Sequence, residues 1–134
     1  MLKQKIFKRA FWTLVVLGVL NFIATILYLH WSLWWFDVIL HFLGGLTVAL
    51  FALWFFSANF DLQNWKLGKI VTMTLISTIC IGILWEFYEL YFGLTFLSDG
   101  WHYFADTGSD LIMDTVGGIV GFLWTNKILN QTKI

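Results

Sequence analysis

The chain of 134 residues contains no proline, a single cysteine and few charged side chains. Because one cysteine cannot form an intramolecular bridge, Cys80 excludes a disulfide-stabilised fold. Only 12% of the residues are charged, whereas 60% are hydrophobic and the mean hydropathy is +0.80. This balance indicates an integral membrane protein rather than a soluble domain. The sequence also has no basic aromatic patch and no glycine-rich phosphate loop, which excludes nucleic acid and nucleotides as expected partners.

Four apolar stretches are long enough to cross a bilayer core of roughly 30 Å, which requires about 20 helical residues. They cover approximately residues 10–30, 34–56, 70–90 and 107–126 of one integral membrane domain, residues 1–134. The sequence therefore predicts an all-α fold, a four-transmembrane-helix bundle in contact with the lipid bilayer.

Basic side chains are missing from one predicted side of the membrane. All eight precede the first stretch, separate the second from the third, or follow the fourth: Lys3, Lys5, Lys8, Arg9, Lys66, Lys69, Lys127 and Lys133. Since Lys and Arg concentrate in cytoplasmic loops, we expect a multi-pass protein of the inner cell membrane with both termini in the cytoplasm. Tryptophans near both ends of the spans, Trp31 and Trp85 among them, are interpreted as interfacial anchors.

Acidic side chains and histidines gather on the opposite, outer side. Six of them fall within the apolar spans: Asp37, His41, Glu86, Glu89, Asp110 and Asp114. A buried charge is costly, and no Lys or Arg of the predicted topology lies near enough to pair with these groups. Bound metal ions or retained protons are the remaining ways to neutralise the carboxylates.

The acidic residues continue into stripes of glycine on the same helix faces. Steps of mostly three or four residues join them on the last three spans: Asp37, His41, Gly44 and Gly45; Gly82, Glu86 and Glu89; and Asp106, Asp110, Asp114, Gly117 and Gly121. Such steps place side chains on one face of a helix. Because glycine lets a second backbone approach closely, we expect the three stripes to face one another and the acids to converge.

The first span offers fewer polar groups. Asn21 and Thr25 continue from Gly18 at steps of three and four residues, so they are candidates for the same interior. Asn21 lies nearer the middle of the span, where an interhelical hydrogen bond would also explain its presence.

Carboxylates and an imidazole on rigid helices are ligand types of divalent metals. The expected metal ligands are His41, Glu86, Glu89, Asp110, Asp114 and Asp37. Manganese, zinc, iron and magnesium all remain open as the bound ion. An acid that stays outside the ligand shell, Glu89 or Asp37, is the candidate catalytic base.

Other polar residues of the outer half have a structural interpretation. His30 and His102 adjoin tryptophans and are interpreted as interfacial residues, while Asp99 and Asp106 are interpreted as solvated. Cys80 lies off the face of the acids and is interpreted as a small core residue.

Three runs carry a resemblance to known proteins: WFDVILHFLGG at residues 35–45, WEFYE at 85–89 and DTGSDLIMDTVGG at 106–118. In this order they resemble the small integral membrane proteins of the YjdF type and, more distantly, the VanZ-like family. The resemblance covers roughly residues 35–122 and implies a polytopic prokaryotic membrane protein of poorly defined activity. VanZ-like proteins usually place Lys after the first Asp, where this chain has Val38, so glycopeptide resistance is not implied.

Two functions of different classes follow from the acidic cluster. In the first, the protein is a metal-dependent enzyme that acts on a lipid or lipid-linked substrate from the outer leaflet. In the second, the cluster is a transport or sensing site for a divalent cation or proton. Four helices are few for alternating access, so transport would require a homo-oligomer. A metal-stabilised structural membrane protein is a third interpretation.

Overall fold

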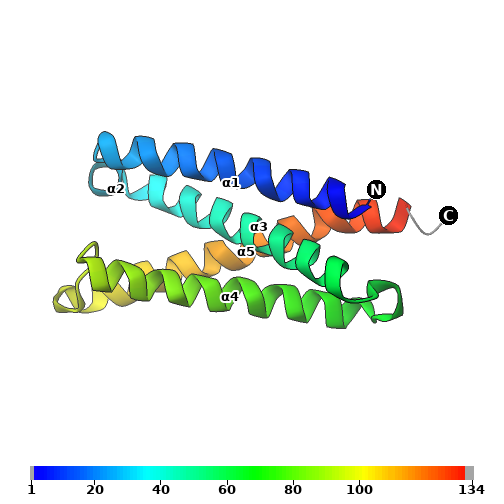
Figure 1. Ribbon diagram of the computed structural model, residues 1–134. Coiled ribbons are helices and arrows are strands. Elements are labelled where there is room, and N and C mark those ends of the chain that lie inside the picture. The colour runs from blue at the N-terminus through cyan, green and yellow to red at the C-terminus, as the bar shows by residue number, and fades with distance from the viewer. Residues whose placement is uncertain (1, 132–134) are drawn as a thin grey trace.

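The structure, a computed structural model, describes residues 2–131, without the side chains of residues 2, 31, 63 and 127–131. Lys133 and the side chains of Trp31 and Lys127 therefore lie outside the described residues. Within this part of the chain, four long helices and one short helix form a bundle without strands (Figure 1). The all-α fold class predicted from the sequence is confirmed.

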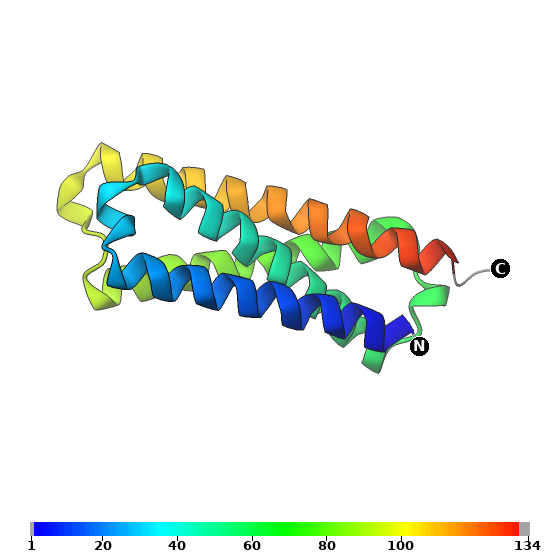
Figure 2. The ribbon, with the colours of Figure 1, turned by 90° about the horizontal axis from the view of Figure 1, so that it is seen from above.

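The elements follow one another as two pairs of long helices. The helices are α1 (Leu2–Ile26), α2 (Leu29–Ser32), α3 (Trp34–Asn59), α4 (Leu67–Phe92) and α5 (Trp101–Gln131). Two 3-10 turns, η1 (Leu62–Asn64) and η2 (Leu97–Asp99), lie in the longer loops. The first and last described residues lie at the same end of the bundle (Figures 1 and 2).

Within the described part of the chain, three helices are long and apolar enough to cross a membrane: Lys3–Ile26, Trp34–Asn59 and Leu67–Phe92. At 31 residues α5 is also long enough, but Asp106, Asp110 and Asp114 in its first half make it less apolar. It packs against both α3 and α4 (Figure 2). The fourth span thus stays a prediction from the sequence, and this packing supports it.

The first helix ends earlier than the apolar stretch of residues 10–30 suggests. α1 stops at Ile26, and Tyr28 adopts a left-handed conformation with φ of 53° before α2 begins. Outside glycine such a conformation costs on the order of 1 kcal/mol or more. The turn places His30 beside the first turn of α3, where its Nδ1 atom lies 3.3 Å from Asp37 Oδ1.

The glycine stripes lie where the helices approach most closely, as the sequence predicts. A Cβ atom at Gly45 would collide with the backbone carbonyl of Asp114, and one at Gly117 with that of Phe42. At Gly82 a Cβ would lie 2.5 Å from Asp114 Oδ2. The contact of α3 with α5 is accordingly the most extensive in the bundle.

Two other small residues do not pack as the sequence suggests. A Cβ at Gly18 would have no neighbour within 4 Å, so α1 has no glycine contact with the bundle at this position. Cys80 is exposed, and its interpretation as a core residue is wrong. On a helix that crosses a membrane, such an exposed position faces lipid, where a small apolar thiol is acceptable.

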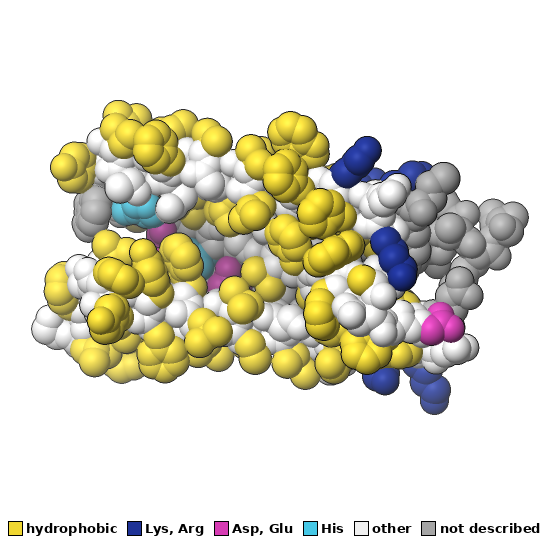
Figure 3. Space-filling model, viewed as in Figure 1, with side chains coloured by type: hydrophobic (Ala, Val, Ile, Leu, Met, Phe, Trp, Pro, Cys, Tyr) yellow, Lys and Arg dark blue, Asp and Glu magenta, His cyan; other side chains and the backbone are white. Residues whose placement is uncertain are grey.

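Apolar side chains fill the half of the bundle near the chain ends. All four long helices contribute to one buried cluster, and a second lies beside it: Ile6, Leu53, Ile70 and Phe122; then Ala10, Leu46 and Leu50. Lys and Arg side chains gather at this end, whereas histidine and acidic side chains show in a hollow toward the other end (Figure 3). We call that second end the carboxylate end.

Candidate metal centre

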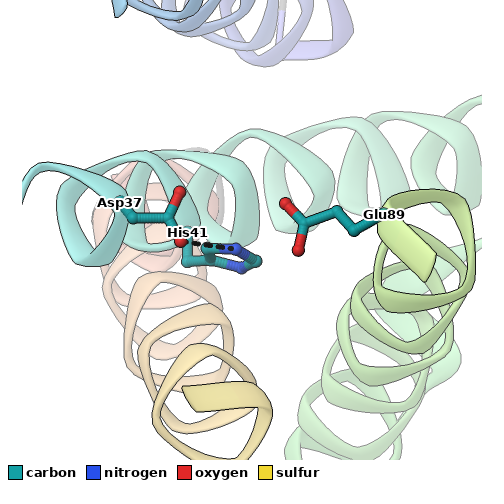
Figure 4. A group of neighbouring side chains, drawn as sticks. All are labelled: Asp37, His41 and Glu89. Atoms are coloured by element: carbon teal, nitrogen blue, oxygen red, sulfur yellow. Dashed lines mark ion pairs between the residues drawn. The ribbon is translucent and has the colours of Figure 1, made fainter. Parts of the chain in front are cut away.

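The six ionisable residues expected at the site converge at the carboxylate end. Three helices contribute two each: Asp37 and His41 of α3, Glu86 and Glu89 of α4, and Asp110 and Asp114 of α5. All but the half-buried Asp37 are buried, with 2–7% of their surface exposed. Side chains of α3 and α4 point toward each other across the site (Figure 4).

His41 stands at the centre of this cluster. Its Nδ1 atom lies 3.4 Å from Asp114 Oδ2, and its Nε2 atom lies 3.9 Å from carboxylate oxygens of Asp37 and Asp110. A neutral ring that donates its Nδ1 proton to Asp114 presents a lone pair at Nε2. Nε2 is buried and has no hydrogen-bond partner, so in this neutral state its lone pair is open to a ligand.

Among the residues that the structure describes, two overlapping groups of ligand atoms are close enough to hold a metal ion. They are Asp37, His41 and Glu89, and His41, Glu86 and Asp110, with ligand atoms within 4.8 Å of one another in each group. Ligands bonded to one ion at about 2.1 Å stand roughly 3–4 Å apart, so a small contraction would close either group on an ion. Both groups share His41, which makes this imidazole the common ligand.

Glu86 is held by a residue that the sequence analysis overlooked. Thr107 of α5 donates its hydroxyl to Glu86 Oε2 at 2.7 Å. The other oxygen, Oε1, is buried without a partner and is free to bind a cation. Thr107 precedes Asp110 by three residues, so helical spacing was the available signal.

Two residues interpreted as interfacial also contact the cluster. The indole Nε1 of Trp85 donates to Glu89 Oε1 at 3.0 Å. His30 pairs with Asp37 across the turn between α1 and α3. Both contacts fix the orientation of a carboxylate at the edge of the site.

The cluster carries an excess of negative charge. Among the described residues, the ion pairs of its carboxylates are made with His30 and His41. Five carboxylates thus face at most two imidazolium charges, in surroundings where an unpaired charge is costly. The C-terminus of α4 points the same way and adds negative potential near its two glutamates. A divalent cation or bound protons would offset this excess.

A cavity of about 710 Å³ adjoins the cluster. Asp37 and Glu89 line it, whereas His41, Glu86 and Asp110 lie behind this lining. The polar residues that the sequence suggested for the first span, Asn21 and Thr25, also line the cavity. The site is therefore a buried set of ligands with an acidic cavity beside it.

The outer part of the cavity is acidic too. Asp99, His102 and Asp106 contribute to the lining near the loop that precedes α5. Partial burial, and then the negative charge of Asp37, raises the pKa of the Asp106 carboxyl, which precedes the predicted span. Asp106 therefore keeps a proton at higher pH than an isolated aspartic acid.

The fold and the cluster define a multi-pass membrane protein with a buried group of histidine and carboxylates. The chain belongs to the family described as "Predicted membrane protein (DUF2238)", whose profile matches residues 5–131. This match includes all six residues of the cluster. No curated protein and no solved structure matches the chain. The relation to YjdF-type and VanZ-like proteins stays a prediction from the sequence.

Proposed function

We propose that this DUF2238 protein is a metal-dependent membrane enzyme that acts on a lipid or another amphiphile. The observation that carries the proposal is the setting of His41, whose Nδ1 atom faces Asp114 while its buried Nε2 atom lacks a partner. A histidine that binds a metal through one nitrogen nearly always donates the N–H of the other to a carboxylate, a backbone carbonyl or water. Glu86 Oε1, another buried oxygen without a partner, belongs to the same group as His41.

In this site His41, Glu86 and Asp110 are the deep ligands, because their ligand atoms are close together and buried. The sequence predicted Asp114 as a further ligand. Its place on the Nδ1 side of the ring favours a different role, which is to orient His41 and make Nε2 more basic.

Asp37 and Glu89 form the boundary between the metal ligands and the cavity. Each can join His41 in coordination or accept a proton from a substrate or water in the cavity. The indole of Trp85 occupies one oxygen of Glu89 and leaves the other for proton transfer. A bound divalent ion would supply an activated water or, if it is iron, redox chemistry on a lipid chain.

Transport of a cation or proton by the same cluster is the alternative. Behind the cluster, the interior is filled by the two apolar clusters described above. The buried hydroxyls of Thr74 and Thr78 donate to carbonyls of their own helix, at 2.8 and 3.0 Å. Among the described residues behind the cluster, Thr47 Oγ1 is the buried hydroxyl without a partner. One isolated hydroxyl makes no continuous polar path, which favours chemistry at the site over passage through it.

Metal analysis of protein purified without chelator tests the site. We expect about one divalent ion per chain in the wild-type protein and loss of that ion in His41→Gln and Glu86→Gln. Asp61→Asn is the matched control, because it removes an exposed carboxylate from the loop before η1. Circular dichroism and gel filtration check that each variant is folded. Equal metal in all four proteins would refute the site.

Lipid turnover tests the enzymatic part of the proposal. Metal-loaded protein would be incubated with membrane lipid extract in mixed micelles, and products followed by mass spectrometry. We expect a product from the wild-type protein and none from Glu89→Gln, which leaves the deep ligands intact. Cation flux into liposomes without any lipid product would overturn the enzyme and support transport.

A further inference from the structure

The cavity beside the cluster lies between α1 and α4. Asn21 and Thr25 of α1 line it, together with Trp85 and Tyr88 of α4. α1 packs mainly on α3, which lies between α1 and α4 in the side view (Figure 1). The space-filling view shows a hollow on this side of the bundle, with acidic and histidine side chains at its floor (Figure 3). The cavity therefore opens sideways, toward the lipid.

Exposed apolar side chains adjoin the lining residues on both helices. Phe22 and Ile26 of α1, neighbours of Asn21 and Thr25, are 65% and 57% exposed, and Leu84 of α4 is 61% exposed. In a bilayer these side chains contact acyl chains. An alkyl chain could thus stay in the membrane while a polar head attached to it enters the cavity.

The lining combines carboxylates with aromatic rings. Four acids border the cavity, Asp37, Glu89, Asp99 and Asp106, beside the two histidines His30 and His102, and the described lining residues include no Lys or Arg. The rings of Trp85 and Tyr88 stack with centroids 5.0 Å apart, and Tyr103 adds a third aromatic side chain. Carboxylates and aromatic faces together attract organic cations, whereas they repel phosphate and sulfate.

The cavity favours a cation in the protein without metal. Its four acids outnumber its two histidines, and Asp37 and Glu89 lie on the side of the buried cluster. Each of these acids that is ionised contributes negative potential to the cavity. Its volume of about 710 Å³ is within the usual range for small-molecule sites.

We propose that the cavity binds the positively charged head of an amphiphile, an amine or quaternary ammonium group, whose alkyl chain passes between α1 and α4 into the bilayer. Asp37 and Glu89 face the charge, and Trp85 and Tyr88 contact the substituents on the nitrogen. This inference rests on the proposed function only where it names the substrate class, since binding of the head itself requires no metal.

Quenching of tryptophan fluorescence by brominated amphiphiles tests this inference, with Trp85 as the reporter. An alkyltrimethylammonium with a brominated chain is titrated into the full protein in nonionic detergent. Trp85→Phe is titrated in parallel, and loss of the saturable component in this variant assigns that component to the cavity, because Trp85 is both the reporter and a contact of the head. An alkyl sulfate with an identical chain is the matched control ligand.

We expect saturable quenching by the ammonium compound and at least about tenfold weaker binding of the sulfate. Asp37→Asn and Glu89→Gln should each weaken ammonium binding about threefold to tenfold. Asp61→Asn should leave it unchanged. Equal binding of the two amphiphiles, or quenching that never saturates, would overturn the inference.

Measurement of metal content on the same samples separates this inference from the proposed function. Selective ammonium binding by a protein without metal would refute the metal site and leave the cation site standing. Bound metal without any preference for the ammonium compound would refute the cation site and leave the metal site standing.

Discussion

At the scale of the residue, Asp114 serves both packing and the candidate chemistry. Its carboxylate lies beside His41 Nδ1 and also fills the space where Gly82 of α4 has no side chain. A Cβ at Gly44 would likewise lie 3.7 Å from Asp114 Oδ1. Helical spacing predicted that these residues share an interior. It could not predict which nitrogen of the imidazole Asp114 faces, because that depends on how the packed helices are oriented.

We predict that Asp114→Asn weakens divalent metal binding by about 10–100-fold without abolishing it, because an amide still accepts the Nδ1 proton but no longer increases the basicity of Nε2. His41→Gln should abolish binding. Competition with a chromophoric chelator for Zn²⁺ or Mn²⁺ gives both affinities. If Asp114→Asn lowers the metal affinity as much as His41→Gln does, Asp114 is itself a ligand, as the sequence predicts. Unchanged affinity would mean that Asp114 has neither role.

Metal binding should also depend on pH in a defined direction. The ligands bind an ion only when the carboxylates are ionised and His41 is neutral at Nε2, so protons compete with the metal. We therefore expect the affinity to fall as the pH is lowered and protons to be released when metal binds at constant pH. A pH electrode in weakly buffered solution measures this release. The variant His41→Gln should release none, and an affinity that rises on acidification would contradict the assigned ligands.

Some residue roles could be predicted from the sequence and others could not. Trp85 and Glu89 are four residues apart on one helix, so their hydrogen bond could have been predicted from spacing alone. Cys80 was misplaced because periodicity gives the angle of a side chain on its own helix but not whether another helix covers it. His30 reaches Asp37 through the turn after α1, which no local pattern revealed.

At the scale of the element, the contact between α3 and α5 depends on glycine. The backbone carbonyls of Asp114 and Phe42 occupy the positions where Gly45 and Gly117 would carry a Cβ. The sequence predicted that the glycine faces converge, since close backbone approach is what small residues allow in membrane helices. The sequence did not predict which two glycine stripes would meet most closely, because α3, α4 and α5 each carry one.

We predict that Gly117→Ala destabilises the bundle by about 1–3 kcal/mol, because its methyl group would collide with the Phe42 carbonyl and force α3 away from α5. Gly18→Ala is the matched control, since open space surrounds that position and alanine favours the helix. Unfolding by sodium dodecyl sulfate in mixed micelles, followed by circular dichroism, gives both free energies. Equal stability of the two variants would contradict the close approach.

The ends of the helices differ in how far the sequence revealed them. Gly93 ends α4 in a left-handed conformation, with φ of 67°, and the amide of Leu94 then donates to the Glu89 carbonyl at 2.9 Å. This is a common glycine signal for a helix end. α1 ends without any such residue, since Tyr28 takes the left-handed conformation. The apolar stretch continues to His30, so its length alone suggested a longer helix.

At the scale of the whole molecule, charge and packing are divided between the two ends. Apolar clusters and Lys or Arg side chains occupy one end, and the ionisable cluster with its cavity occupies the other (Figure 3). The charge division was predictable because it depends only on the order of residues along a chain that crosses the membrane repeatedly. The cavity could not be predicted from the sequence, because it depends on the packing of α1 against α3, which leaves a space beside α4.

The same division predicts the orientation of the protein in the membrane. In a Cys80→Ala background, Ser98→Cys should react with a membrane-impermeant maleimide on intact cells, and Asn64→Cys should react only after the membrane is opened. Both positions are exposed, in the loops of η2 and η1. The wild-type protein is the control for labelling within the lipid, because its single cysteine, Cys80, lies in the middle of α4 and is exposed on the surface of that helix. The reverse pattern would place the acidic cavity on the cytoplasmic side, and its amphiphile would then have to come from the inner leaflet.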